Sequence, residues 1–181
     1  MNNKIRCILV VFFFGNIFSQ QENILNIDST QCQNFLSLID YKYKNNICFD
    51  SIKSEMEIFQ FFNCLLTCEG NKKKSKLGNV FSLGNVAAHI PPVTIELGAL
   101  YLISAKFYEK KDFALAIALR DSLTGKINPD GCIKKTYSSY RAWFNKLKEY
   151  GISKARELDF DPLQGTGLNW YGTYNRGHKK E

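Results

Sequence analysis

Histidine is almost absent from this sequence, which holds only His89 and His178 among its 181 residues. An enzyme that relies on an imidazole as general base, or on a cysteine activated by one, has few residues to use here. His178 lies in a basic terminal stretch, whereas His89 shortly precedes two prolines in a predicted loop. One catalytic alternative is retained: a small secreted hydrolase that uses His89 with Cys132, or with the carboxylates at 157–161.

Metal and cofactor motifs are also missing. Cys64 and Cys68 are four residues apart, but no second cysteine pair or close histidine completes a zinc site. The acids at 157–161 do not have the spacing of a calcium loop. The glycines at 165–167 neither follow a predicted strand nor open a helix, as a phosphate-binding loop would. We therefore expect no metal and no cofactor.

The longest uninterrupted hydrophobic run stands at the N-terminus. Lys4 and Arg6 precede an apolar stretch from Cys7 to Phe14, and a smaller, polar stretch follows up to residue 20. This order is typical of a secretory signal peptide, and the run is shorter than the roughly 20 residues of a membrane-spanning helix. The sequence thus predicts a signal peptide at 1–20, a secreted or periplasmic product, and no transmembrane segment after its removal.

The charge balance is moderate. Without Lys4 and Arg6, 22 basic residues stand against 17 acidic ones, a net charge of about +5. Outside the cytoplasm such a charge favours another protein or an anionic envelope component as partner, and not a nucleic acid. One basic cluster, formed by Lys72, Lys73 and Lys74, falls between two predicted helices.

Five cysteines remain after residue 20, which is an odd number. In an oxidising compartment disulfides are expected, and at least one thiol of a monomer stays unpaired. The disulfide candidates are Cys32, Cys48, Cys64 and Cys68, in a pairing that the sequence leaves open. Cys132 is expected in the first turn of a helix, where the helix dipole favours a lowered thiol pKa. Its default interpretation is a structural or disulfide-bonded cysteine.

Hydrophobic spacing at three and four residues recurs along the chain, and no run alternates as a strand does. The sequence therefore predicts an all-α fold: a single compact domain at 21–172 of five to six helices, an irregular bundle built from antiparallel helix hairpins. The helices are expected at 29–42, about 51–69, 92–107, 112–123, 129–150 and about 153–159.

The stretch from Leu100 to Asp121 resembles a tetratricopeptide hairpin. Phe107, Lys111, Phe113 and Ala116 stand near that family's aromatic, turn, aromatic and small positions. The resemblance covers one hairpin, without the expected turn glycine and without a second copy at a 34-residue period. We interpret it as the general chemistry of a helix hairpin.

The C-terminal stretch is rich in glycine and aromatic residues and follows no period. Leu163, Leu168, Trp170 and Tyr171 are too apolar for a free tail, so we predict an ordered, non-helical strap over the helices, with Trp170 and Tyr171 at its rim. Residues 173–181 are predicted to be a basic, flexible tail.

No arrangement of residues reaches the standard of an active site, so we expect a protein that is not an enzyme. The function predicted is that of an exported helical protein that binds a macromolecule without catalysis, of an inhibitor, immunity or envelope-interaction type. The candidate binding residues are Trp170, Tyr171, Trp143, Arg141, Lys72, Lys73, Lys74 and His89.

Overall fold

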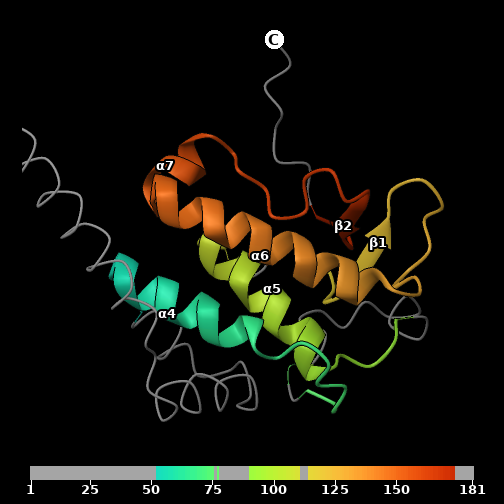
Figure 1. Cartoon of the computed structure of the whole chain (residues 1–181). Helices are drawn as coiled ribbons and strands as arrows, with labels where there is room; N and C mark the ends of the chain where they lie inside the picture. The colour runs from blue at the N-terminus through green and yellow to red at the C-terminus, as the bar shows by residue number, and fades with distance from the viewer. Residues whose placement is uncertain (1–51, 76, 78–89, 111–113, 174–181) are drawn as a thin grey trace, which may run out of the picture.

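The computed structural model describes residues 52–75, 77, 90–110 and 114–173, and this part of the chain is mostly helical (Figure 1). Its elements are α4 (Glu55–Leu66), α5 (Ile95–Phe107), β1 (Leu119–Asp121), α6 (Cys132–Tyr150), α7 (Ile152–Glu157) and β2 (Leu168–Trp170). The predicted signal peptide, the predicted helix at 29–42 and residues 174–181 lie outside the described residues.

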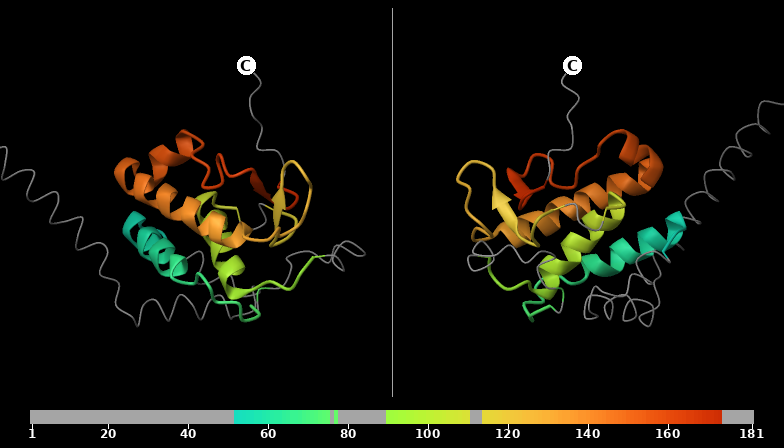
Figure 2. Two further views of the ribbon diagram at one scale, coloured as in Figure 1. Left: turned by 45° about the vertical axis from the view of Figure 1, so that its right-hand side comes forward. Right: turned by 180° about the vertical axis from the view of Figure 1, so that it is seen from behind.

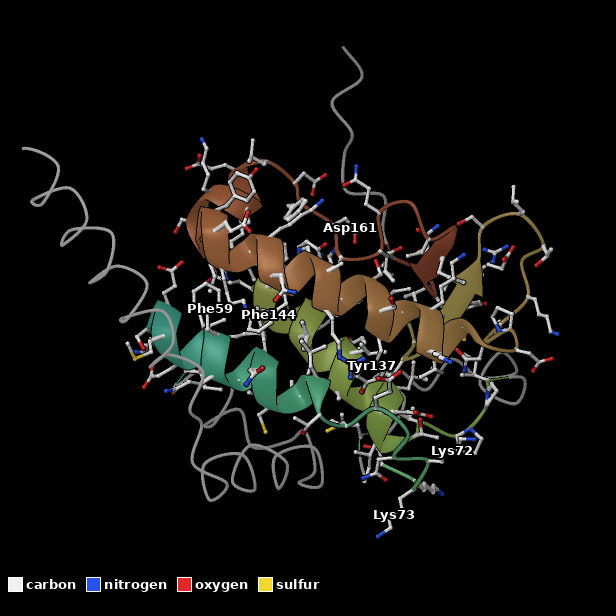
Figure 3. The ribbon with its side chains drawn as sticks, viewed as in Figure 1. Phe59, Lys72, Lys73, Tyr137, Phe144 and Asp161 are labelled. Atoms are coloured by element: carbon white, nitrogen blue, oxygen red, sulfur yellow. The ribbon has the colours of Figure 1, made fainter. Side chains whose placement is uncertain are left out.

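The core forms where α4, α5 and α6 pack against one another. α5 crosses behind α4 and α6 in Figure 1, and every residue from Glu96 to Phe107 is buried. The sequence explains this position, because α5 carries few charged residues and has no polar stripe. Phe59 of α4 meets Phe144 of α6 edge to face, with ring centroids 6.0 Å apart (Figure 3).

The helices begin and end at residues suited to those positions. Ser54 caps α4 in a capping box, in which its hydroxyl accepts the Glu57 N–H at 3.2 Å and its own N–H donates to the Glu57 carboxylate at 2.9 Å. These Ser54 groups hold the pKa of Glu57 below its ordinary value. Thr94 caps α5, and Gly151, at φ 77°, ends α6.

The expected helix at 112–123 is wrong, and the described part of the chain is mostly helical with one small two-stranded sheet where an all-α fold was expected. The described part of this stretch runs from Ala114 through bends into strand β1, which pairs antiparallel with β2 in a two-stranded sheet. Leu119 pairs with Trp170, Arg120 with Asn169 and Asp121 with Leu168. Leu123, expected on the buried side of a helix, is exposed instead.

Long-range pairing explains the difference. The Leu115 N–H donates to the Tyr171 carbonyl at 3.0 Å, and the Tyr171 N–H donates to the Ala118 carbonyl at 2.8 Å. A short apolar run such as 114–119 fits a buried helix or a buried strand equally well. Which of the two it forms depends on the segment that it pairs with in the fold, which here is β2. That partner lies beyond two helices in the chain. The sheet stands at the end of α6 opposite α7, as Figure 2 shows from two sides.

Candidate functional site

An open groove of about 580 Å³ lies between α6 and the loop that precedes β2. Its volume is in the range of small ligand sites, although its mouth is wide. α6 and its cap contribute Gly131, Lys134, Lys135, Ser138, Ser139 and Ala142, and the loop contributes Gln164, Gly165 and Thr166. Among these described residues there is no carboxylate, imidazole or thiol.

The loop wall of the groove is fixed to α6. The Ser139 hydroxyl donates to the Pro162 carbonyl at 2.7 Å. The Thr166 hydroxyl donates to the Leu163 carbonyl at 2.6 Å and accepts the Leu168 N–H at 3.0 Å. The wall is therefore held by its own hydrogen bonds and leads directly into β2.

The helix wall of the groove is positively charged. Lys134 and Lys135 are exposed in the first turns of α6, whose N-cap is Gly131 without a side-chain hydrogen bond. The first turn carries no acidic residue. A helix N-terminus already has a partial positive charge, so two lysines there destabilise the helix slightly. Together with that partial charge, their ammonium groups attract anions. The groove is suited to bind acidic groups.

Trp170 is not at a rim but in the core, with 3 % of its surface exposed. Its indole N–H is shared between the Ser104 hydroxyl at 3.2 Å and the Tyr140 hydroxyl at 3.1 Å. These two hydroxyls also hydrogen-bond each other. Trp170 therefore fastens β2 to α5 and α6, which corrects its assignment as a binding residue.

Trp143 has a structural position as well. Its side chain is buried between Phe62 and Phe107, at ring distances of 5.7 and 5.0 Å. Its indole N–H donates to the Phe160 carbonyl at 2.8 Å. Trp143 is thus unavailable to a partner.

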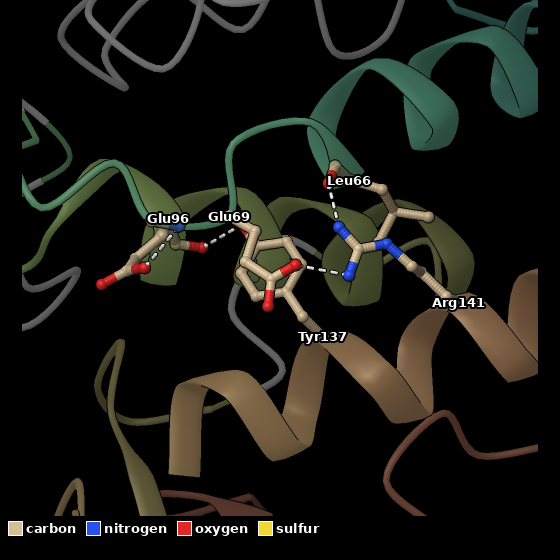
Figure 4. A network of polar contacts seen from close by, with 6 residues as sticks. Leu66, Glu69, Glu96, Tyr137 and Arg141 are labelled. Atoms are coloured by element: carbon tan, nitrogen blue, oxygen red, sulfur yellow. Dashed lines mark hydrogen bonds and ion pairs between the residues drawn. The ribbon is translucent and has the colours of Figure 1, made fainter. Parts of the chain in front are cut away.

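Arg141 is exposed, but its guanidinium is occupied (Figure 4). It forms an ion pair with Glu69, donates to the Leu66 carbonyl at 3.2 Å and lies over the Tyr137 ring at 5.6 Å. Tyr137 in turn donates to the Glu96 carbonyl at 2.9 Å, and burial raises the pKa of its hydroxyl. This network joins α4, α5 and α6, so the main role of Arg141 is to hold these helices together.

The remaining binding candidates that the structure describes do not line the groove. Lys72, Lys73 and Lys74 are exposed on a loop whose backbone pairs with the start of α5, and Figure 3 shows Lys72 and Lys73 pointing into solvent on the other side of α6 from Asp161. Tyr171 is half-buried beside β2. His89 lies outside the described residues.

Two of the candidate cysteines carry free, buried thiols. Cys68 is free in the structure, which removes it from the disulfide candidates, and Cys132 is free as well. Burial raises the pKa of Cys68 to about 11. Burial also raises the pKa of Cys132, with Asp130 and Glu96 adding to the effect, against the lowered pKa expected for a helix start. Cys64, in contrast, is not a free thiol.

We expect Cys68 and Cys132 to resist iodoacetamide in the native protein at pH 8 and to react fully in guanidinium chloride. Only the thiolate reacts, and a pKa near 11 leaves Cys68 about a hundredfold less thiolate than its ordinary value of 9.0 would at this pH. Differential alkylation followed by peptide mass mapping measures both residues. Rapid native labelling of either peptide would contradict the buried environment.

Within the described ranges, no group of three His, Cys, Asp or Glu side chains is placed to hold a metal ion. None of the helices described there is both long and apolar enough to span a membrane. The described residues form a mostly helical fold, with an open groove beside α6 that is lined by two lysines. No protein-family model, curated protein or solved structure matches the chain.

Sequence reasoning missed Lys134, Lys135 and the loop opposite them. A signal was present, since two lysines early in a helix reverse the usual preference for acids there. The groove itself was hidden because its second wall comes from residues thirty positions further along. Only the path of the chain after α7 brings that wall against α6.

Proposed function

We propose that the protein is exported through its N-terminal signal peptide and binds another macromolecule without catalysing a reaction. An inhibitor, immunity or envelope-interaction protein fits this description. The export part rests on residues 1–20 and is checked by N-terminal sequencing of the protein recovered outside the cytoplasm, where a start at residue 1 would contradict cleavage.

The groove beside α6 is the observation that carries the binding part. Its walls offer two ammonium groups and the Ser138 hydroxyl as hydrogen-bond donors to acidic groups, since the Ser139 and Thr166 hydroxyls already donate to backbone carbonyls. Acid–base or nucleophilic catalysis needs a side chain with a suitable pKa within reach, and the described lining holds only lysines, hydroxyls and an amide. Binding is therefore the chemistry that this site supports best.

Two finer features belong to the same proposal. Residues 162–172 act as a strap over the helices, supported by the burial of Leu163, Leu168 and Trp170. Cys64 forms a disulfide with Cys32 or Cys48, supported by the free thiols at the two other cysteines. A non-reducing digest would show the linked peptide, and a Cys64 peptide with a free thiol would refute the bridge.

The double variant K134E/K135E is expected to lose at least about tenfold in affinity for a fluorescent polyglutamate peptide, measured by anisotropy at low salt. Glutamates at a helix N-terminus stabilise the helix, so a loss of binding would not come from unfolding. The matched control K72E/K73E reverses two equally exposed lysines away from the groove. Equal losses in both variants, or no binding by the wild type, would contradict the groove as the site.

A further inference from the structure

Leu123 stands at the tip of the turn that follows β1, with 95 % of its surface exposed. Single exposed leucines are common on protein surfaces, and exposure alone has little meaning. Here the leucine lies on a turn that is held by a defined set of hydrogen bonds. Each of its neighbours has a defined partner, so the exposure is built into the fold.

The carboxylate of Asp121 organises this turn. It accepts the N–H groups of Leu123 and Thr124 at 3.0 and 2.7 Å, and the Thr124 hydroxyl at 3.0 Å. The backbone closes with the Gly125 N–H on the Asp121 carbonyl and the Asp121 N–H on the Lys126 carbonyl, each at 3.0 Å. The backbone of such a turn loses little conformational entropy when a partner binds it.

The turn is continuous with the groove. The Ser122 N–H donates to the Gly167 carbonyl at 2.9 Å, and the Asn169 side-chain amide donates to the Ser122 hydroxyl at 2.9 Å. Gly167 directly follows Thr166, which lines the groove. Figure 1 shows this turn beside β2 and the N-terminal end of α6. Tip and groove therefore form one surface, which we call the tip–groove surface.

The segments that meet at this surface carry basic side chains. Exposed residues are Arg120 of β1, Lys126 of the turn, and Lys134 and Lys135 of α6. Two acids lie on the same segment. The Asp121 carboxylate accepts hydrogen bonds within the turn, and the Asp130 carboxylate lies 4.0 Å from the Lys126 ammonium. The complementary surface is acidic and has an apolar pocket.

We infer that the tip–groove surface docks a protein with an acidic surface, with Leu123 inserted into an apolar pocket of that protein. The inference rests on the proposed binding function and names its partner class. A protein segment fills a concave groove, whereas a flat bilayer surface contacts its rim only. A buried anchor surrounded by charges is the usual anatomy of a protein interface.

Photo-crosslinking at two leucines tests the surface in cells that secrete the full chain. Benzoylphenylalanine replaces Leu123 in one variant and Leu158 in another, since Leu158 is also exposed, at 58 %, but lies after α7 at the other end of α6. We expect a protein adduct of one mass at 123, its loss when K134E/K135E is added, and no such adduct at 158. Matching adducts at both positions, or none at 123, would overturn the inference.

The partner identified from that adduct is then purified for affinity measurements. Leu123→Ala is expected to weaken its binding at least about tenfold, and Leu158→Ala less than about twofold. Equal effects would refute the anchor. Leu123-dependent co-sedimentation with phosphatidylglycerol vesicles, without a protein adduct, would also refute it in favour of a membrane surface. If polyglutamate binding still depends on Lys134 and Lys135 in either case, the proposed function survives while this inference fails.

Discussion

Replacing Trp170 with alanine is expected to lower the free energy of unfolding by about 3–5 kcal/mol, the usual cost of removing a large buried aromatic side chain. The ring packs edge to face on Tyr101 at 5.4 Å, and its N–H satisfies the Ser104 and Tyr140 hydroxyls. The substitution leaves a cavity at the point where β2 meets the helices. Urea denaturation followed by circular dichroism gives the value.

Trp170→Phe separates the two contributions of the indole. Most of the ring volume stays, while the N–H donor is lost, and the expected cost is about 1–2 kcal/mol because Ser104 and Tyr140 still bond each other. Tyr171→Ala, at a half-buried neighbour, provides a second comparison. If Trp170→Ala were no more destabilising than Tyr171→Ala, residues 162–172 would not act as a strap.

Arg156→Met is expected to destabilise the protein by about 1.5–3 kcal/mol, the range for hydrogen bonds from a charged donor. The guanidinium donates to the carbonyls of Phe107 and Lys106 at 2.6 and 3.2 Å, at the end of α5. It also forms an ion pair with Glu109 at 2.9 Å. Methionine keeps much of the side-chain volume but leaves the last carbonyls of a buried helix without this donor.

Lys154→Met on the same short helix is the matched control. Lys154 pairs with Glu157 at 3.0 Å, and both side chains are largely exposed. Exposed pairs of this kind contribute at most about 1 kcal/mol. Equal losses for the two variants in the same urea titration would show that Arg156 is an ordinary surface arginine and not the cap of α5.

The helices were predictable because their signals are local. The predicted bounds of α4, α5, α6 and α7 lie within a few residues of the observed ones. They were predicted from stripes of apolar side chains, from capping residues near the helix starts and from Gly151 at the end of α6. The predicted start of α6 was too early, because Pro129 suggested a start at that residue whereas the helix begins after Gly131. Helix ends are the least certain part of any such prediction.

The sheet and the site depended on contacts between distant residues. Trp143 and Trp170 were assigned to binding because the sequence does not show that Phe160, Ser104 and Tyr140 receive their N–H groups. The groove was hidden for the same reason, since α6 and the 164–166 loop are unrelated in sequence. Tertiary contacts of this kind are absent from any local pattern.

The pairing of β1 with β2 also bears on the order in which the protein folds. β2 follows β1 only after α6 and α7, so joining them closes a long loop, which is slow compared with packing neighbouring helices. We therefore expect the helices to assemble first and the sheet to form last. Until then the apolar run at 114–119 has an unpaired edge, and it is the segment through which partly folded chains would associate.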